Sequence, residues 1–228
     1  MYYFCSTIQG ANVMKYDINI KDRSRVVVGN VGELLPALLP HKRVVVVSDT
    51  NIDRHYHSLI EPYDHVLIGL GEASKTLLTL DAIYRRFIEL GVDRSCFVLA
   101  IGGGIVTDVA GFAASTFLRG IRFVQIPTTL LAMVDSSVGG KTGIDLPAGK
   151  NLCGAFYQPH AVLCDTDVLD TLPEDIFRDG CAEIIKYAVL FDPELFTILE
   201  RDGMDFNREL VIARCIAHKR NCVEQDEF

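Results

Sequence analysis

The stretch LAIGGGIVTDVAGFAASTFLRG (Leu99–Gly120) decides the fold. It begins within an apolar run, Cys96–Ile101, which stops abruptly at three glycines, Gly102–Gly104, and a helical pattern follows. This order predicts a strand, a tight turn and the N-terminus of a helix, where exposed backbone N–H groups can bind a phosphate. The isolated cations that follow, in a chain of net charge −8, indicate a site for anionic, phosphate-bearing ligands.

The composition of the chain narrows the class of protein to which it can belong. The 228 residues, 49% hydrophobic and 23% charged, are typical of a soluble globular protein with one large domain, or one domain and part of another. The acidic balance disfavours nucleic acid as a partner. Because no run of about 18 apolar residues occurs, we expect no membrane span. Seven cysteines, odd in number and without a C-x-x-C pair, favour free thiols and a cytoplasmic location.

Six short β-rich runs alternate with helical patterns over the first two-thirds of the chain. They are Arg25–Val28, Arg43–Ser48, His65–Ile68, Cys96–Ile101, Phe123–Ile126 and Ala161–Cys164. The second contains an unbroken VVVV, as expected of a strand covered on both faces. Alternation of this kind predicts an open α/β sheet with largely parallel strands.

The pattern changes near Asp167. Thr171 stands three residues before Glu174, the spacing of a capping box, with Pro173 in the first turn of the expected helix. Helical patterns then continue to the end, where the chain stops inside a charged helical pattern. We therefore expect an α/β domain over residues 1–167, with a disordered leader over 1–13, and an incomplete helical domain over 168–228.

Two phosphate-binding motifs fit the glycine clusters only in part. In the dinucleotide pattern G-x-G-x-x-G, Gly102 and Gly104 occupy the first two positions, but Thr107 occupies the third, so the match alone is weak. The GGKT at Gly139–Thr142 suggests a P-loop, but Asp135 stands where that motif requires its first glycine. We reject the P-loop because a carboxylate there would repel the phosphates.

Other polar residues stand in neutral or apolar surroundings. Lys141 and Lys150 lie in glycine-rich sequence, where cations are suited to binding an anion rather than only to solvation. Glu183 and Lys186 are three residues apart on an expected helix and face the same way. Since their neighbours are small or apolar, the pair is more than a solvated surface ion pair.

Five segments together resemble a known family. They are GGGIVTDVAGF (Gly102–Phe112), FLRGIRFVQIPTTLL (Phe117–Leu131), VDSSVGGKTGID (Val134–Asp145), GKNLCGAFYQP (Gly149–Pro159) and GCAEIIKYAV (Gly180–Val189). In this order they resemble the 3-dehydroquinate synthases of the shikimate pathway. The resemblance implies a Rossmann-like NAD-binding domain followed by an all-helical domain, in a homodimer. It also implies conversion of 3-deoxy-D-arabino-heptulosonate 7-phosphate to 3-dehydroquinate and phosphate, with NAD and a zinc or cobalt ion.

The resemblance also implies roles for individual residues. It makes Asp135, Lys141 and Lys186 catalytic and gives Glu183 to the metal. Its substrate contacts are Arg119, Lys141, Lys150, Asn151 and Lys186, and we expect these last four to converge on one anionic pocket. Its cofactor contacts are Asp49, Asn51, Glu72, Lys75, Gly103, Gly104, Ile105, Asp108, Thr128, Thr129, Lys141 and Lys150.

The histidines depart from the family pattern. Dehydroquinate synthases add two histidine ligands to the glutamate, the first in an N-L-G-H-T motif, and none of the six histidines here lies in such a motif. We therefore expect a family sequence without its C-terminal portion, inactive by itself. Three alternatives stay open: another sugar-phosphate cyclase, a metal-dependent polyol dehydrogenase, against which the Lys141 and Lys150 cluster argues, and a non-catalytic NAD-binding fragment.

Overall fold

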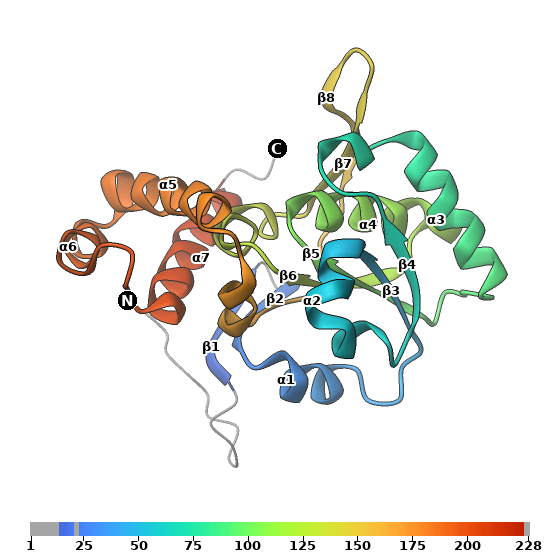
Figure 1. The fold of residues 1–228 in the computed structure, drawn as a ribbon, viewed down its shortest axis with the longest axis horizontal. Coiled ribbons are helices and arrows are strands. Elements are labelled where there is room, and N and C mark those ends of the chain that lie inside the picture. The colour runs from blue at the N-terminus through green and yellow to red at the C-terminus, as the bar shows by residue number, and fades with distance from the viewer. Residues whose placement is uncertain (1–13, 21–22, 226–228) are drawn as a thin grey trace.

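The computed structural model describes residues 14–20 and 23–225 (Figure 1). The leader expected over residues 1–13 lies outside the described residues. Within them, seven strands form one sheet in the order β1-β2-β9-β6-β5-β3-β4. The strands are β1 (Met14–Ile20), β2 (Ser24–Gly29), β3 (Val44–Asp49), β4 (Asp64–Ile68), β5 (Phe97–Gly102), β6 (Arg122–Pro127) and β9 (Ala161–Cys164).

The expected sheet is confirmed. Each of the six predicted β-rich runs forms a strand, and every pairing among those six strands is parallel. The edge strand β1 was not predicted, and it pairs antiparallel with β2. Val44–Val47 is buried along its whole length, as expected of a strand with helices on both faces.

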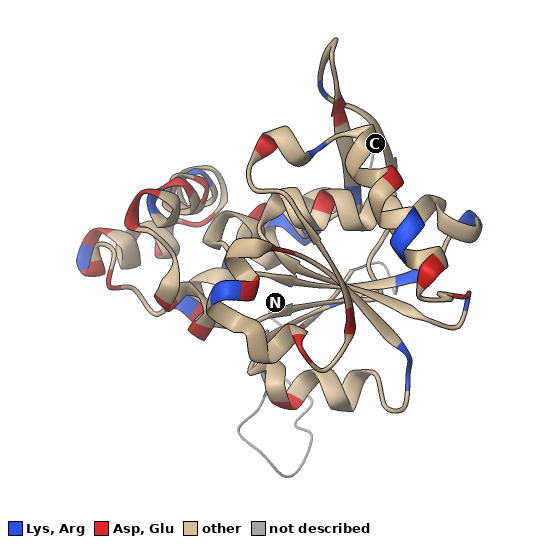
Figure 2. Ribbon diagram, turned by 45° about the vertical axis from the view of Figure 1, so that its right-hand side comes forward, with Lys and Arg blue, Asp and Glu red and all other residues tan. Residues whose placement is uncertain are grey.

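Helices cover both faces of the sheet. On one face, α3 (Leu77–Glu89) and α4 (Gly104–Thr116) share a core with β3, β4, β5 and β6. On the other, α1 (Val31–Leu38) and α2 (Thr50–Ile60) pack on the apolar side chains of the central strands. Charged residues lie mostly on the helices and near the ends of strands (Figure 2). No helix in the described part of the chain is both long and apolar enough to cross a membrane.

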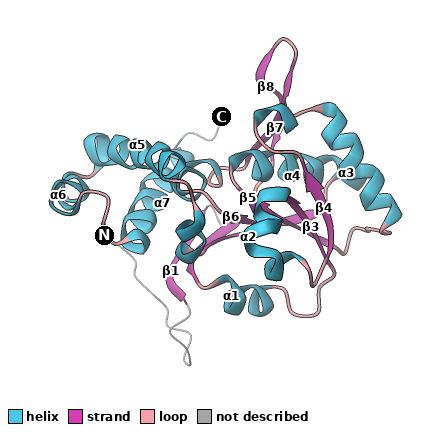
Figure 3. Ribbon diagram, in the orientation of Figure 1, coloured by secondary structure: helices cyan, strands magenta, loops and turns pink. Residues whose placement is uncertain are grey.

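The C-terminal helices pack beside the β1 and β2 end of the sheet (Figure 3). They are α5 (Glu174–Phe191), α6 (Pro193–Asp202) and α7 (Arg208–Gln225). Their buried side chains form one core with those of β2, β9 and η3 (Ala132–Ser136), a short π-helical segment. The helical character expected after residue 167 is thus present, while the domain boundary there stays a prediction.

The expected capping box at the start of α5 is wrong. The helix begins at Glu174 after Pro173, and no side chain caps it. Thr171 instead ends the 3₁₀ segment Thr166–Thr171, and its hydroxyl lies 2.7 Å from the Tyr56 hydroxyl, which also donates to the Val168 carbonyl. The threonine hydroxyl therefore binds a side chain of α2, a contact that no local spacing could reveal.

A second, two-stranded sheet was missed, because the sequence there looks like a glycine-rich loop. Strands β7 (Lys141–Leu146) and β8 (Gly149–Phe156) form an antiparallel hairpin that projects from the body of the protein (Figure 1). Gly143 and Gly154 face each other, and a Cβ on Gly154 would lie 2.1 Å from the Thr142 carbonyl oxygen. The two glycines are therefore needed for the close approach of the two strands.

We expect Gly154→Ala to break the pairing of β7 with β8, because its methyl group would overlap backbone that cannot move aside. The cost should be on the order of 2 kcal/mol of unfolding free energy. Urea denaturation and amide exchange of residues 141–156 measure it. Gly149→Ala is the matched control, since its Cβ would meet only the flexible Leu152 side chain, at 3.2 Å. Equal exchange in the two variants would contradict the prediction.

Candidate functional site

The glycine turn lies at the carboxyl edge of the sheet, where β5 leads into α4. Strand β5 ends at Gly102, and α4 begins at Gly104 after Gly103, with no side chain capping its first turn. A Cβ on Gly103 would lie 3.0 Å from Thr129 Cγ2, and one on Gly104 would lie 3.1 Å from Ser136 Oγ. Glycine at both positions therefore allows Thr129 and Ser136 to pack close to the turn, and the helix N-terminus, which no side chain caps, can bind an anion.

The neighbouring strands bring further predicted residues to this edge. Strand β6 follows β5 in the sheet, and the Thr128 N–H donates to the Gly102 carbonyl at 3.0 Å. Asp49 ends β3 on the other side and caps α2, accepting the N–H groups of Asn51 and Ile52 at 2.9 Å each. Ile105 lies half-buried in the first turn of α4. The structure thus gathers these residues at one edge, while their contact with a cofactor stays a prediction.

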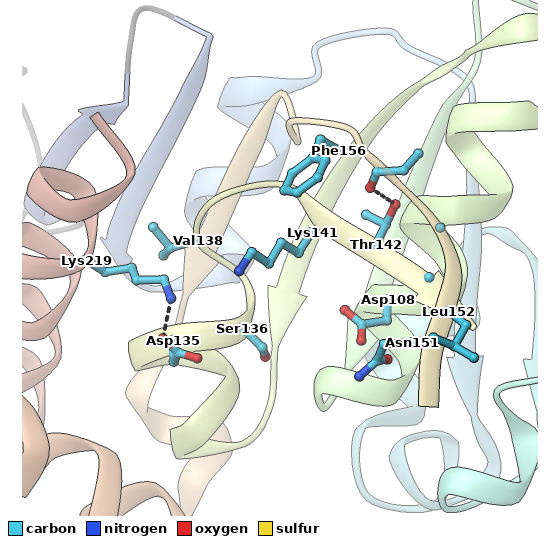
Figure 4. Close-up of a pocket in the computed structure, with 13 residues that line it drawn as sticks. Asp108, Asp135, Ser136, Val138, Lys141, Thr142, Asn151, Leu152, Phe156 and Lys219 are labelled. Atoms are coloured by element: carbon cyan, nitrogen blue, oxygen red, sulfur yellow. Dashed lines mark hydrogen bonds and ion pairs between the residues drawn. The ribbon is translucent and has the colours of Figure 1, made fainter. Parts of the chain in front are cut away.

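A pocket of about 570 Å³ lies beside the turn (Figure 4). Three parts of the chain supply its walls: α4, η3 with the following residues, and the β7–β8 hairpin, while α7 contributes one lysine. The lining residues are Asp108, Asp135, Ser136, Val138, Lys141, Thr142, Gly143, Asn151, Leu152, Gly154, Ala155, Phe156 and Lys219. Two lysines and two carboxylates line it, so the pocket suits a ligand that carries both an anion and hydroxyl groups.

Asp135 is the pocket carboxylate that accepts hydrogen bonds from two different side chains. Its Oδ1 accepts hydrogen bonds from Lys219 Nζ at 2.6 Å and from the Tyr187 hydroxyl at 2.9 Å. Burial raises the pKa of Asp135, but the Lys219 and Tyr187 donors and the nearby Lys186 charge more than offset it, so this pKa is lowered. Burial and the adjacent Asp135 raise the pKa of Tyr187. Asp135 is therefore ionised and Tyr187 protonated at neutral pH.

Lys219 and Tyr187 are the site residues that the sequence analysis missed. Tyr187 directly follows Lys186, so the same motif contained the only signal for it. Lys219 gave none, because it lies 84 residues from Asp135 in a helix with several other charges. Lys141 was predicted, and in Figure 4 its ammonium group points toward the side of the pocket formed by Asp135 and Lys219.

Asp108 and Asn151 line the opposite side of the pocket and share one lysine. Lys75 Nζ donates to Asp108 Oδ2 at 2.9 Å and to Asn151 Oδ1 at 2.6 Å. Burial raises the pKa of Asp108, and the Lys75 ammonium offsets only part of this effect. Three of the predicted residues are therefore directly connected, although they come from three separate segments.

The remaining predicted residues lie outside the pocket lining. Lys150 is 3.2 Å from Glu72 in an exposed ion pair, and Arg119 is exposed with a left-handed backbone, φ 66°. Lys186 faces the same way as Glu183, as their spacing predicted, and pairs with it, while its ammonium lies over the Tyr187 ring. The burial expected from the apolar neighbours is absent at Lys186, whose side chain is exposed. The convergence of Lys141 and Asn151 is thus present, whereas that of Lys150 and Lys186 on the same pocket stays a prediction.

Glu183 is the residue for which a metal-ligand role was predicted. Its Oε1 is buried and, although it forms the ion pair with Lys186, it accepts no hydrogen bond of good geometry. A buried carboxylate oxygen that is held only by this ion pair fits a single metal ligand. Among residues 14–20 and 23–225, no three histidine, cysteine, aspartate or glutamate side chains cluster closely enough to hold an ion. His218, which follows Glu183 in the chain, instead contacts Asp192 at 2.8 Å.

An open parallel sheet, with a glycine turn at its carboxyl edge and a charged pocket beside it, defines an α/β protein of the dinucleotide-binding type. Profiles of the N-terminal and C-terminal parts of 3-dehydroquinate synthase match residues 65–179 and 180–228. The chain belongs to the 3-dehydroquinate synthase family, as its motifs predicted.

Known proteins agree with this assignment. The chain is 49% identical over 217 residues to the 3-dehydroquinate synthase of Pelobacter propionicus. This alignment covers 86% of this chain and 60% of that protein. A solved 2-deoxy-scyllo-inosose synthase, complexed with carbaglucose-6-phosphate, NAD⁺ and Co²⁺, has a TM-score of 0.79 at 27% identity. The match covers 94% of this chain and 63% of the synthase chain. The structure of 2-epi-5-epi-valiolone synthase from Streptomyces hygroscopicus, with NAD⁺ and Zn²⁺ bound, has a TM-score of 0.72 at 29% identity. That match covers 98% of this chain and 62% of the synthase. This chain therefore spans less than two-thirds of each of them.

Proposed function

We propose that the protein acts as a 3-dehydroquinate synthase, which converts 3-deoxy-D-arabino-heptulosonate 7-phosphate to 3-dehydroquinate and inorganic phosphate. One observation carries the proposal: Asp135, Lys141 and Lys219 meet in a pocket next to the glycine turn. Lysines suit the phosphate and carboxylate of such a substrate, and an ionised aspartate suits its hydroxyl groups. Membership of the family supplies the identity of the substrate.

The glycine turn fits NAD. The N-terminus of α4 follows the turn without a side-chain cap, so its backbone N–H groups suit a pyrophosphate. Thr128 and Thr129 lie beside the turn, and Asp49 lies where a ribose hydroxyl is commonly bound. When bound, NAD supplies a reversible hydride acceptor, so that oxidation of a substrate hydroxyl and the later reduction leave it unchanged overall.

The protein's own residues would bind and orient the substrate. Lys141 and Lys219, which both line the pocket, would hold its anionic groups, and Asn151 would donate to an oxygen at the outer end. Asp135 would accept a hydrogen bond from a ring hydroxyl, since the neighbouring donors keep it ionised. In the reaction, oxidation of that hydroxyl acidifies the adjacent C–H, phosphate leaves, the ketone is reduced, and the ring opens and closes again by an aldol step.

We also propose a zinc or cobalt ion, for which Glu183 would supply one ligand. The buried Oε1 of Glu183 is consistent with that role. We derive no step through the ion, because the described residues offer a single ligand at this place. We further propose, from the sequence, a homodimer in which the exposed Arg119 reaches a neighbouring subunit. The sequence is also the basis for proposing a cytoplasmic location.

A second candidate is a cyclase that makes another carbocycle, which the likeness to the inosose and valiolone synthases favours. The experiment incubates the protein with NAD, zinc or cobalt, and the heptulosonate phosphate, and measures inorganic phosphate and NADH together. Once the metal site is complete, of which the described residues offer one ligand, we expect phosphate release without net NADH. Net NADH formation would instead indicate a polyol dehydrogenase, and a protein that binds NAD but not the heptulosonate phosphate would contradict the proposal.

A further inference from the structure

The β7–β8 hairpin forms a wall of the pocket but is not part of the large sheet. At its base, Ile144 joins the core between α4 and the sheet, and the Thr142 hydroxyl donates to the Ala155 carbonyl across the hairpin at 2.8 Å. Its outer end has no such core, because Leu152 is 61% exposed. The position of the pocket residues on this outer half therefore depends on polar contacts.

Those contacts connect the hairpin to the segment between β4 and α3. The Asp145 N–H donates to the Lys75 carbonyl at 2.8 Å, and Lys75 Nζ donates to Asn151 Oδ1 at 2.6 Å. Within the hairpin, the Asn151 N–H donates to Asp145 Oδ1 at 2.7 Å. Lys75 thus binds both strands of the hairpin, one through its backbone and the other through its side chain.

Lys75 itself is fixed in place. It is only 4% exposed, and its ammonium also binds Asp108 on α4 at 2.9 Å. The other cross-connection, between Lys150 and Glu72, is exposed and contributes little for that reason. The buried, charge-assisted contacts of Lys75 are therefore the main attachment of the outer hairpin.

Lys75 also decides which way the Asn151 amide faces. An ammonium group has only donors, so it must be met by the amide oxygen, and the Nδ2 donors are turned away from it. In Figure 4 the Asn151 nitrogen points away from β8 into the pocket. The backbone of Asn151 is left-handed, φ 55°, a conformation that asparagine adopts more readily than most residues.

We propose that Lys75 is a positioning residue for the substrate: it fastens the hairpin and holds Asn151 with its amide donors facing the pocket. The identity of that substrate rests on the proposed function. The clamp itself is a property of the ligand-free protein, so it can be measured without any ligand.

The first measurement is amide hydrogen exchange of the ligand-free protein. Lys75→Met should accelerate exchange of residues 145–152 about tenfold or more, while β5 and β6 stay protected. Lys42→Met, at an exposed lysine, is the matched control and should change nothing there. Asn151→Ala should accelerate exchange of the same residues, and the double variant should not exceed Lys75→Met, because both changes remove the contact between Lys75 and Asn151.

The second measurement separates the clamp from binding. Asn151→Asp keeps an oxygen for Lys75, so hairpin protection should be retained. It replaces the Nδ2 donors with a second oxygen, so the affinity of the NAD-loaded protein for the heptulosonate phosphate should fall about tenfold or more. Calorimetric titration compares this variant with the unchanged protein.

Unchanged hairpin exchange in both Lys75→Met and Asn151→Ala, or additive effects in the double variant, would overturn the clamp. If Lys75→Met does not fold, the exposed Asn151 still allows the test through Asn151→Ala. Full substrate affinity in Asn151→Asp would overturn the amide orientation. A protein that binds neither NAD nor the heptulosonate phosphate would contradict the proposed function instead, while the exchange rates would still decide on the clamp.

Discussion

Replacing Gly103 with valine is expected to abolish NAD binding while the chain stays folded. The first added carbon would already lie 3.0 Å from Thr129 Cγ2, and the branches of valine would extend into the approach to the α4 N-terminus. Loss of close contact with the pyrophosphate should weaken binding at least about a hundredfold, or roughly 3 kcal/mol. Titration with NAD, followed by calorimetry or nucleotide fluorescence, measures the change.

Gly32→Val is the matched control for this variant. Gly32 lies in the first turn of α1, on the opposite face of the sheet, and its Cβ would meet only Asn30 Oδ1, at 3.2 Å. Its NAD affinity should equal that of the unchanged protein. An unaltered affinity in Gly103→Val, with circular dichroism showing a folded chain, would contradict the assignment of the turn.

Replacing Asp192 with alanine is expected to cause the largest loss of stability. This carboxylate, 4% exposed, accepts two hydrogen bonds from Arg214, at 2.7 and 2.8 Å, and one contact from His218 at 2.8 Å. It also caps α6 through the Leu195 N–H at 3.0 Å. Its removal would leave the Arg214 charge without its buried partner, at a cost of about 3–5 kcal/mol of unfolding free energy.

Glu194→Ala is the control, since Glu194 also contacts Arg214, at 3.0 Å, but its side chain is 81% exposed. That change should cost less than about 1 kcal/mol. Urea denaturation at pH 7 compares the two variants. Similar urea midpoints for the two variants would contradict the prediction, because they would show that the buried Asp192 stabilises the fold no more than the exposed Glu194.

The same contact predicts a dependence on pH. Burial raises the pKa of Asp192, but hydrogen bonds from Arg214, His218 and the Leu195 N–H more than offset it, so its folded pKa is well below the ordinary value. A lowered folded pKa gives stability that is fully present above the unfolded pKa of about 3.9 and is lost as the pH falls toward the folded pKa. The difference between the unchanged protein and Asp192→Ala should therefore shrink below about pH 4 in urea titrations.

The parts of the fold that depend on local pattern were predictable. Val44–Val47 and the run that ends at Gly102 are continuous apolar segments, and each forms a buried parallel strand. The β7–β8 hairpin was not predictable, because Gly143 and Gly154 weaken any strand pattern, and their value appears only once the strands approach each other. The Thr171 cap failed for a similar reason, since its partner Tyr56 is distant in sequence.

The site divides in the same way. The glycine turn and Lys141 lie in short, distinctive segments, and the structure places them at the carboxyl edge and in the pocket. Lys219 reaches Asp135 only because α7 packs against η3, a contact between elements far apart in the chain. Asn151 was predicted, but its orientation depends on Lys75, and no spacing within the sequence indicates that pair.

The most direct test of the account is calorimetric titration of the NAD-loaded protein with the heptulosonate phosphate, compared with Lys141→Met. We expect saturable binding to the unchanged protein and an affinity at least about tenfold lower in Lys141→Met, because a lysine that points into the pocket would lose its charge. Equal affinity in the two proteins, or no binding to either, would contradict the account.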